Sequence, residues 1–91
     1  MSTKGTRPAT PLKYLRSALN QTVLVKLKDG HEYIGIMELV DHTMNVVLSE
    51  CQEYDSDGNP VARYGRVLIR GSQIVFVSIN YGQVAPEHAI G

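Results

Sequence analysis

Apolar and polar residues follow two periods along the chain, a helical one first and then an alternating one. Three leucines recur at a spacing of three to four: Leu12, Leu15 and Leu19. They fall on one face of a helix. Thr10 followed by Pro11 is a helix-start signal, because the hydroxyl can cap and a proline needs no amide hydrogen there. We expect a helix of about two turns over 11–19, too short to persist unless its apolar face packs on something else.

From Thr22 onward, apolar residues take every second position, which is the period of a strand. Val23, Val25 and Leu27 share one face of it. Asp29-Gly30 predicts a two-residue hairpin turn, since Asp and Gly tolerate the positive φ that such turns require. A second, antiparallel strand is expected over 32–40. Gly35 inside that strand indicates a sharp bend or a close backbone approach.

Three more strands are expected in the second half of the chain. The third is long, from about Met44 to Tyr54, and a loop over 55–59 follows it. A short strand over 66–70 and a turn at Gly71-Ser72 come next. The last strand, 73–79, is almost wholly apolar, which is typical of burial on both faces or of a subunit contact.

The order of elements predicts a mostly β fold, with a short helix before five antiparallel strands. Five short strands, one of them bent at glycine, make a small, partly open, SH3-like barrel. One folded domain is expected over 10–80, with a flexible arm over 1–9 and a tail over 81–91. An open barrel leaves unpaired backbone groups at its edges. The apolar last strand is the best candidate to pair with a neighbouring copy, and such head-to-tail contacts close into rings.

Composition narrows the classes of function. Ninety-one residues suffice for one domain, and a chain this small commonly gains stability by oligomerising. The lone cysteine, Cys51, excludes an internal disulfide and disfavours a cysteine zinc site. Nine basic residues balance nine acidic ones, so any binding of nucleic acid must be local. Neither a membrane span nor a secretory signal is apparent, so we expect a cytoplasmic protein, or a nuclear one in a eukaryote.

Two groups of residues resemble the two-part signature of the Sm and Sm-like RNA-binding proteins. The first group is Gly35, Leu39, Asp41, Met44, Asn45 and Leu48, and the second is Ile69-Arg70-Gly71 with Val75. The resemblance extends from Pro11 to Ile79. Tyr64-Gly65 is most similar to the archaeal members and the Sm F branch. The resemblance implies the Sm fold and a ring, usually of seven subunits, that binds RNA at a central pore without enzymatic activity or cofactor.

The residues themselves suggest how one nucleotide is held. Alternate loops at one end of a small barrel lie side by side, so the loop of Asn45 and the loop of Arg70 would frame one slot. An Asn amide matches the donor and acceptor on a uracil edge, and a guanidinium can stack on the base. We expect Thr43, Asn45, Arg70 and Gly71 to bind RNA, with Asp41, His42, Met44 and Ser72 supporting the loops. Asp41 is expected to brace the loop through backbone amides or Arg70.

Thr43 departs from the family pattern. The resemblance places His, Tyr or Phe at this position, where it stacks on the second face of the base. We therefore expect weaker or less uridine-selective binding than in close relatives. The same departure keeps a second reading open, a ring that acts as a protein scaffold in a ribonucleoprotein or RNA-decay assembly and binds RNA only weakly.

Other chemistries are disfavoured by spacing. Asp55, Asp57 and Asn59 resemble a calcium loop, but the required glycine is at Gly58 and not two positions later, and the twelfth position is Arg66 where the loop requires Glu. Consecutive Asp41, His42 and Thr43 cannot form a linear catalytic relay, and Cys51 is best read as a packing thiol. His31 and His88 are expected to be exposed. A monomeric cold-shock or OB-type binder is disfavoured because the chain has one Phe and no aromatic platform.

The sequence therefore predicts a non-enzymatic, ring-forming protein that binds single-stranded uridine-rich RNA in RNA processing, stabilisation or chaperoning. Its expected partners are further copies of itself, other Sm-like subunits and RNA-processing proteins, with no cofactor, metal or membrane.

Overall fold

The strands and the helix follow the expected order. The computed structural model describes residues 12–79, so Thr10, Pro11, the arm over 1–9 and the tail over 81–91 lie outside it. The elements are α1 (Leu12–Arg16), β1 (Thr22–Leu27), β2 (Glu32–Val40), β3 (Val46–Tyr54), β4 (Pro60–Ile69), the 3₁₀ turn η1 (Gly71–Gln73) and β5 (Ile74–Ser78). The prediction of a short helix and five antiparallel strands is confirmed. No helix in the described part is long and apolar enough to cross a membrane.

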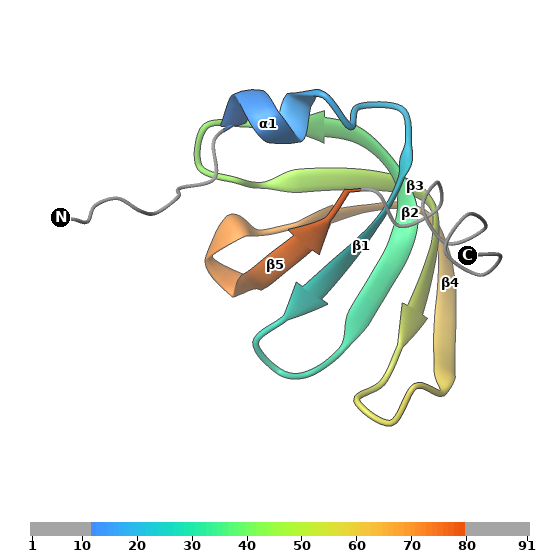
Figure 1. Cartoon of the computed structure of the whole chain (residues 1–91). Coiled ribbons are helices and arrows are strands. Elements are labelled where there is room, and N and C mark those ends of the chain that lie inside the picture. The colour runs from blue at the N-terminus through green and yellow to red at the C-terminus, as the bar shows by residue number, and fades with distance from the viewer. Residues whose placement is uncertain (1–11, 80–91) are drawn as a thin grey trace, which may run out of the picture.

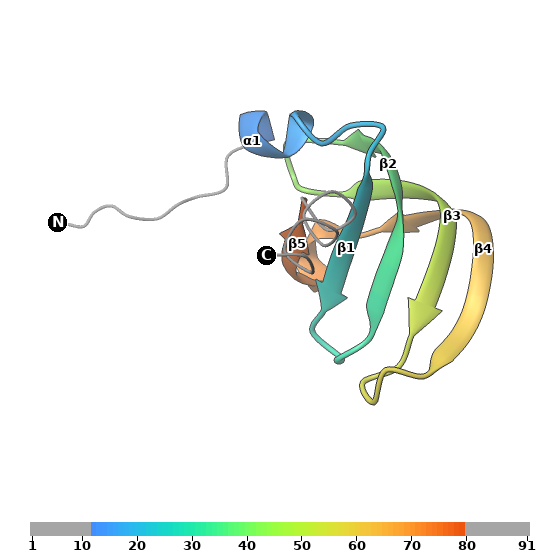
Figure 2. The same ribbon diagram turned by 45° about the vertical axis from the view of Figure 1, so that its right-hand side comes forward.

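The five strands form one sheet in the order β4-β3-β2-β1-β5. Figures 1 and 2 show β2 and β3 bending so strongly that their two halves run in different directions, while α1 lies across the end of the barrel. Within residues 12–79, β4 pairs only with β3, and β5 pairs only with β1. The barrel is therefore open, and β4 and β5 are its two free edges.

The core lies inside the bend. Its fully buried side chains are Val23, Val25, Met37, Val46, Leu48 and Cys51. The alternation predicted for β1 is confirmed, because Val23 and Val25 are both inaccessible. α1 contributes Leu15, which is 3% exposed, and the turn after it contributes Ala18, which is 2% exposed. The helix thus covers the barrel end with its apolar face, as expected.

The helix is shorter than expected. It ends at Arg16, and the chain continues in tight turns in which the amides of Ser17, Ala18 and Leu19 donate to carbonyls three residues back. This 3₁₀-type winding keeps Leu19 partly buried against the core. Asn20, with φ of 68°, ends the turns and leads into β1.

Gly35 has the role that its place in a strand predicts. A Cβ added there would lie 2.8 Å from Ser49 O and 3.1 Å from Cys51 Cα, so β3 crosses directly over the glycine. The register between β2 and β3 skips a residue at the same place, where Glu50 has φ of 48°. An extra residue of this kind bends the strand and increases its twist. The glycine and the bulge together produce the curvature of the barrel.

The first hairpin turn differs from the prediction. The Leu27 amide donates to His31 O at 2.9 Å, which leaves a three-residue loop instead of two. In this loop only Gly30 has positive φ, at 95°. The Asp29 carboxylate instead accepts the His31 amide at 2.9 Å. A type I turn followed by a left-handed glycine gives this geometry.

Two strand predictions were wrong. β4 spans ten residues from Pro60 and is not a short strand over 66–70. Proline is tolerated at the first position of an edge strand, and exposed polar side chains are expected along such an edge, so neither breaks the strand. β3 begins at Val46, two residues later than expected, because residues 44 and 45 belong to the preceding loop.

β5 is not buried on both faces within one chain. Val75 is 57% exposed and Phe76 is 48% exposed. The strand is also shorter than the expected 73–79, because residue 73 belongs to η1. Its apolar composition is therefore that of an uncovered edge.

Candidate nucleic-acid interface

The loop between β2 and β3 is closed by its own backbone. The Asp41 amide donates to Asn45 O at 3.1 Å, and the Met44 amide donates to Asp41 O at 2.9 Å. Met44 adopts φ of 68°, a conformation that costs roughly 1–2 kcal/mol for a residue with a Cβ. A tight turn that holds a non-glycine residue in this region must be stabilised by other contacts.

The carboxylate of Asp41 supplies those contacts. Its Oδ1 accepts the Thr43 amide at 2.9 Å, the Thr43 hydroxyl at 2.8 Å and the Asn45 amide at 3.0 Å. The hydrogen bond from the Asn45 backbone, followed by that from the Thr43 side chain, lowers the pKa of Asp41 to about 2. Asp41 thus braces its own loop through backbone amides, and it makes no hydrogen bond to Arg70.

The side chain of Asn45 joins the two loops. Its Oδ1 accepts the Gly71 amide at 2.8 Å. Its Nδ2 donates to Asp41 Oδ2 at 3.1 Å and to Thr43 Oγ1 at 2.9 Å. Both amide hydrogens are therefore engaged, while Oδ1 keeps one lone pair for another donor.

Gly71 is required by the closeness of the loops. A Cβ at Gly71 would lie 2.1 Å from Thr43 O and 2.8 Å from Met44 O. No residue with a side chain fits there unless the backbone moves. The two loops therefore meet backbone to backbone, 26 residues apart in sequence.

Arg70 projects from the junction as an exposed cation. It directly precedes η1, and its carbonyl accepts the Gln73 amide at 2.9 Å. Within residues 12–79 its guanidinium has no hydrogen-bond or ion-pair partner. A cation left unpaired beside a rigid polar loop is available to an anion or to the face of a base.

The other predicted loop residues differ in their surroundings. Met44 is partly buried and packs against the core. His42 and Ser72 are exposed, and neither side chain bonds to any part of the chain that the structure describes. The structure therefore brings together Asp41, Thr43, Asn45, Arg70 and Gly71. Their contact with RNA stays a prediction.

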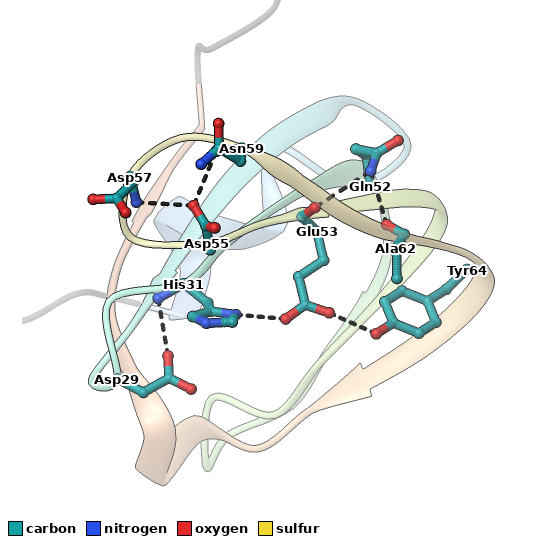
Figure 3. A network of polar contacts seen from close by, with 9 residues as sticks. All are labelled: Asp29, His31, Gln52, Glu53, Asp55, Asp57, Asn59, Ala62 and Tyr64. Carbon is teal, nitrogen blue, oxygen red and sulfur yellow. Dashed lines mark hydrogen bonds and ion pairs between the residues drawn. The ribbon is translucent and has the colours of Figure 1, made fainter.

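A second polar cluster surrounds Glu53 and was missed at the level of sequence (Figure 3). Glu53 is only 7% exposed, with Oε2 2.6 Å from His31 Nδ1 and Oε1 accepting the Tyr64 hydroxyl at 2.6 Å. Tyr33 and Tyr64 stack with centroids 6.2 Å apart. His31 was expected to be merely exposed and is instead hydrogen-bonded. The available signal was that Glu53 follows Cys51 by two positions and so shares its buried face.

The acidic loop after β3 is a turn. Asp55 Oδ1 accepts the amides of Asp57 and Asn59, both at 2.9 Å (Figure 3). Gly58 takes the positive φ, 87°, that closes it. No group of three potential metal ligands occurs among the described residues.

Known proteins similar to this chain point to one family. Residues 13–79 match the LSM domain. A putative snRNP Sm-like protein of Methanococcoides burtonii is 44% identical over 68 residues, covering 75% of this chain and 93% of the relative. An Sm protein of Pyrococcus abyssii, solved in complex with a uridine heptamer, superposes with a TM-score of 0.72 at 37% identity, covering 77% of this chain and 97% of that one.

A heptameric archaeal Sm protein superposes with a TM-score of 0.67 at 34% identity, covering 74% of this chain and 96% of that one. The matched segment contains the whole bent sheet and both loops of the junction. The chain therefore belongs to the LSM domain family, the Sm and Sm-like proteins, as its sequence signature predicts.

Proposed function

We propose that this protein assembles into a ring of identical subunits, seven in number, and binds single-stranded uridine-rich RNA at the junction of its two loops. A similar archaeal protein is heptameric, and another was solved with a uridine heptamer. The observation that carries the proposal is the 2.8 Å hydrogen bond from the Gly71 amide to Asn45 Oδ1, which presents Asn45 and Arg70 at one place.

The ring would be built from the two free edges of the sheet. β4 and β5 each have a pairing partner on one side only. Their exposed apolar residues include Val61, Leu68, Val75 and Phe76. Pairing β4 of one copy with β5 of the next satisfies both edges and covers these side chains, and a fixed rotation per copy closes the circle.

Base recognition would use the amide of Asn45 with one exchange of partner. Nδ2 would keep its hydrogen bond to Asp41 and give up the one to the exposed Thr43 hydroxyl. The amide hydrogen freed in this way would be donated to O4 of uracil. The free lone pair of Oδ1 accepts the hydrogen on N3. Cytosine presents a donor and an acceptor in the reverse places, so the same amide orientation favours uracil.

Affinity would come from stacking and repetition. Arg70 stacking on a base contributes roughly 1–3 kcal/mol, so a single slot binds weakly. Slots repeated around a ring raise the avidity without any new contact. Thr43 offers no second stacking surface, so each slot is weaker than one that places an aromatic ring there.

The proposed role is RNA processing, stabilisation or chaperoning, with no catalysis and no cofactor. The Asp41 carboxylate and the Thr43 hydroxyl are both committed to holding their own loop, which supports a binding role over a catalytic one. Other Sm-like subunits and RNA-processing proteins are the proposed further partners, in the cytoplasm or, in a eukaryote, in the nucleus.

Native mass spectrometry with and without oligouridine tests the assembly and the binding together. The expected result is a seven-subunit ring that gains mass with oligouridine and binds oligoadenosine more weakly. Arg70→Ala should keep the ring and lose roughly tenfold or more in oligouridine affinity. Lys28→Ala is the matched control, because Lys28 is another exposed cation and lies in the loop between β1 and β2, outside the two loops of the junction and off β4 and β5. Equal losses in both variants would refute the slot.

A second candidate function is a ring-shaped protein scaffold with weak RNA binding of its own. The observation in its favour is that one amide hydrogen of Asn45 is already donated to the Thr43 hydroxyl, so it is not free for a base. The ratio of absorbance at 260 and 280 nm of the purified ring separates the two. Bound nucleic acid supports the RNA-binding ring, and a nucleic-acid-free ring that ignores oligouridine supports the scaffold.

A further inference from the structure

The cluster around Glu53 connects three strands on the inner face of the bent sheet. Glu53 on β3 pairs with Tyr33 on β2 and with Ala62 on β4. Tyr64 lies two positions beyond Ala62, so its ring reaches the same face and donates to the carboxylate (Figure 3). Glu53 is the buried charged residue of the described chain, and a buried carboxylate is tolerated only with partners.

This cluster fixes an edge strand. Among the described strands β4 pairs with β3, and none of them pairs with its outer side. On one face Tyr64 is held by Glu53 at 2.6 Å. On the other, Gln52 Nε2 donates to Ala62 O at 2.8 Å, and Arg63 Nε donates to Gln52 Oε1 at 3.2 Å. The half of β4 that precedes Gly65 is therefore positioned by side chains on both faces.

The remaining partner of Glu53 is titratable near neutral pH. His31 Nδ1 lies 2.6 Å from Glu53 Oε2, and the His31 side chain is 32% exposed. The groups facing it are acidic or phenolic: Asp29 in the hairpin loop, Glu53 on β3, Asp55 in the next loop, and beyond Glu53 the hydroxyls of Tyr33 and Tyr64. The hydrogen bond to Glu53 is the main reason that the pKa of His31 is raised above its ordinary value of 6.5.

We infer that Glu53 positions the free β4 edge. We also infer that the charge of His31 makes this positioning, and with it the assembly of the ring, dependent on pH. The inference rests on the proposed function, because β4 is the edge through which the ring would close. Tyr64 is the connecting residue, since its hydroxyl joins the carboxylate and its backbone belongs to the edge.

The direction of the pH effect follows from the two charges. Below pH 6.5, down to the pH at which Glu53 takes up a proton, the imidazolium and the carboxylate are both charged, and the contact has its full strength. As the pH rises through the raised pKa of His31, the imidazole becomes neutral, so the attraction between two opposite charges is lost and only a weaker hydrogen bond from a neutral donor to the carboxylate remains. On the acid side, the hydrogen bonds from Tyr64 and then His31 lower the pKa of Glu53, so its contribution is lost only below its ordinary range.

The decisive experiment measures ring dissociation by sedimentation at pH 6 and pH 9, in wild type, His31→Gln and His88→Gln. In wild type we expect the dissociation midpoint to lie at a roughly two- to fivefold higher protein concentration at pH 9, the range of a partly exposed ion pair. For His31→Gln, the dissociation midpoint should lie at the same protein concentration at both pH values. His88→Gln, which removes a histidine from the tail, should retain the response of wild type.

Two further variants separate positioning from folding. Tyr64→Phe keeps the stacked ring and deletes the hydroxyl, so it should weaken assembly at both pH values while circular dichroism stays that of wild type. Glu53→Gln removes the charge at nearly the same volume and should abolish the pH response even if it lowers stability. If rings of wild type and His31→Gln respond equally to pH, the inference fails and the proposed ring stands. If no ring forms at either pH, both fail.

Discussion

Two carboxylates organise the two polar regions of this molecule in opposite ways. Asp41 is partly exposed, and its hydrogen bonds come from residues within four positions of itself. Glu53 is buried, and its partners lie 22 and 11 positions away, at His31 and Tyr64. Asp41 therefore shapes one loop, whereas Glu53 ties strands together. Removing the Asp41 carboxylate should therefore disturb its own loop, whereas removing the Glu53 carboxylate should disturb the contacts between strands.

The comparison separates a site built for contact from one built for support. At the Asp41 junction the polar groups are partly or fully exposed, and Arg70 has no partner within the described residues. At Glu53 the polar groups satisfy one another. We therefore propose that the first region acts by contact with a ligand and that the second acts through the strand that it positions.

The largest expected effect comes from deleting the buried carboxylate. Glu53→Ala leaves the Tyr64 hydroxyl and the His31 imidazole without their acceptor and should reduce the free energy of unfolding by about 3 kcal/mol. Urea denaturation followed by circular dichroism measures the change. Asp57→Ala is the control for removing a carboxylate, because Asp57 is exposed and its hydrogen bond to Asp55 comes from its backbone amide, so stability should change by no more than about 0.5 kcal/mol. Equal midpoints for the two variants would contradict the difference between the regions.

The next effect concerns the junction of the loops. Gly71→Ala places a Cβ against the carbonyls of Thr43 and Met44, so the loops must separate and the Asn45 contact lengthens. We expect a loss of roughly 1–3 kcal/mol in stability. We also expect a loss of at least tenfold in oligouridine affinity by titration.

Gly65→Ala is the control for this substitution. A Cβ added at Gly65 meets nothing within 4 Å, so the variant should be as stable as wild type or slightly more stable. A Gly71→Ala protein that bound oligouridine as wild type does would show that the close approach of the loops is not needed for the site.

The sequence predicted the Asp41 region well because its geometry is local. Asp41, Thr43 and Asn45 lie within one turn, and the family signature links that turn to Arg70 and Gly71. The Glu53 region could not be predicted in the same way. The bulge at Glu50 shifts the register of β3, and only that register decides which residues of β2 and β4 face Glu53. The start and length of β4 were misjudged for another reason. An edge strand needs no regular apolar alternation, so its sequence carries little signal of where it begins.

A smaller effect is expected from changing the charge of Asp41 alone. In Asp41→Asn an amide replaces the carboxylate, and its NH2 group in place of Oδ2 would face the Asn45 Nδ2 donor that now bonds there at 3.1 Å. Two donors cannot bond, so the Asn45 side chain should turn and lose its orientation toward Gly71. We expect a roughly fivefold loss of oligouridine affinity with the ring intact. Ser17→Ala, which removes an exposed hydroxyl near the helix, is the control and should bind as wild type does.

The smallest effect should be the acid titration of the Asp41 loop itself. The pKa of Asp41 is lowered to about 2 from an ordinary value of 3.8, so its stabilisation of the loop is complete above 3.8 and is lost only as the pH falls through about 2. Amide chemical shifts of Thr43 and Asn45, followed by NMR from pH 5 to pH 2, should stay constant until the lower end of that range. A midpoint near pH 4 would mean that the carboxylate is held no more strongly than in an unfolded chain. The local brace would then not be what keeps Met44 at positive φ.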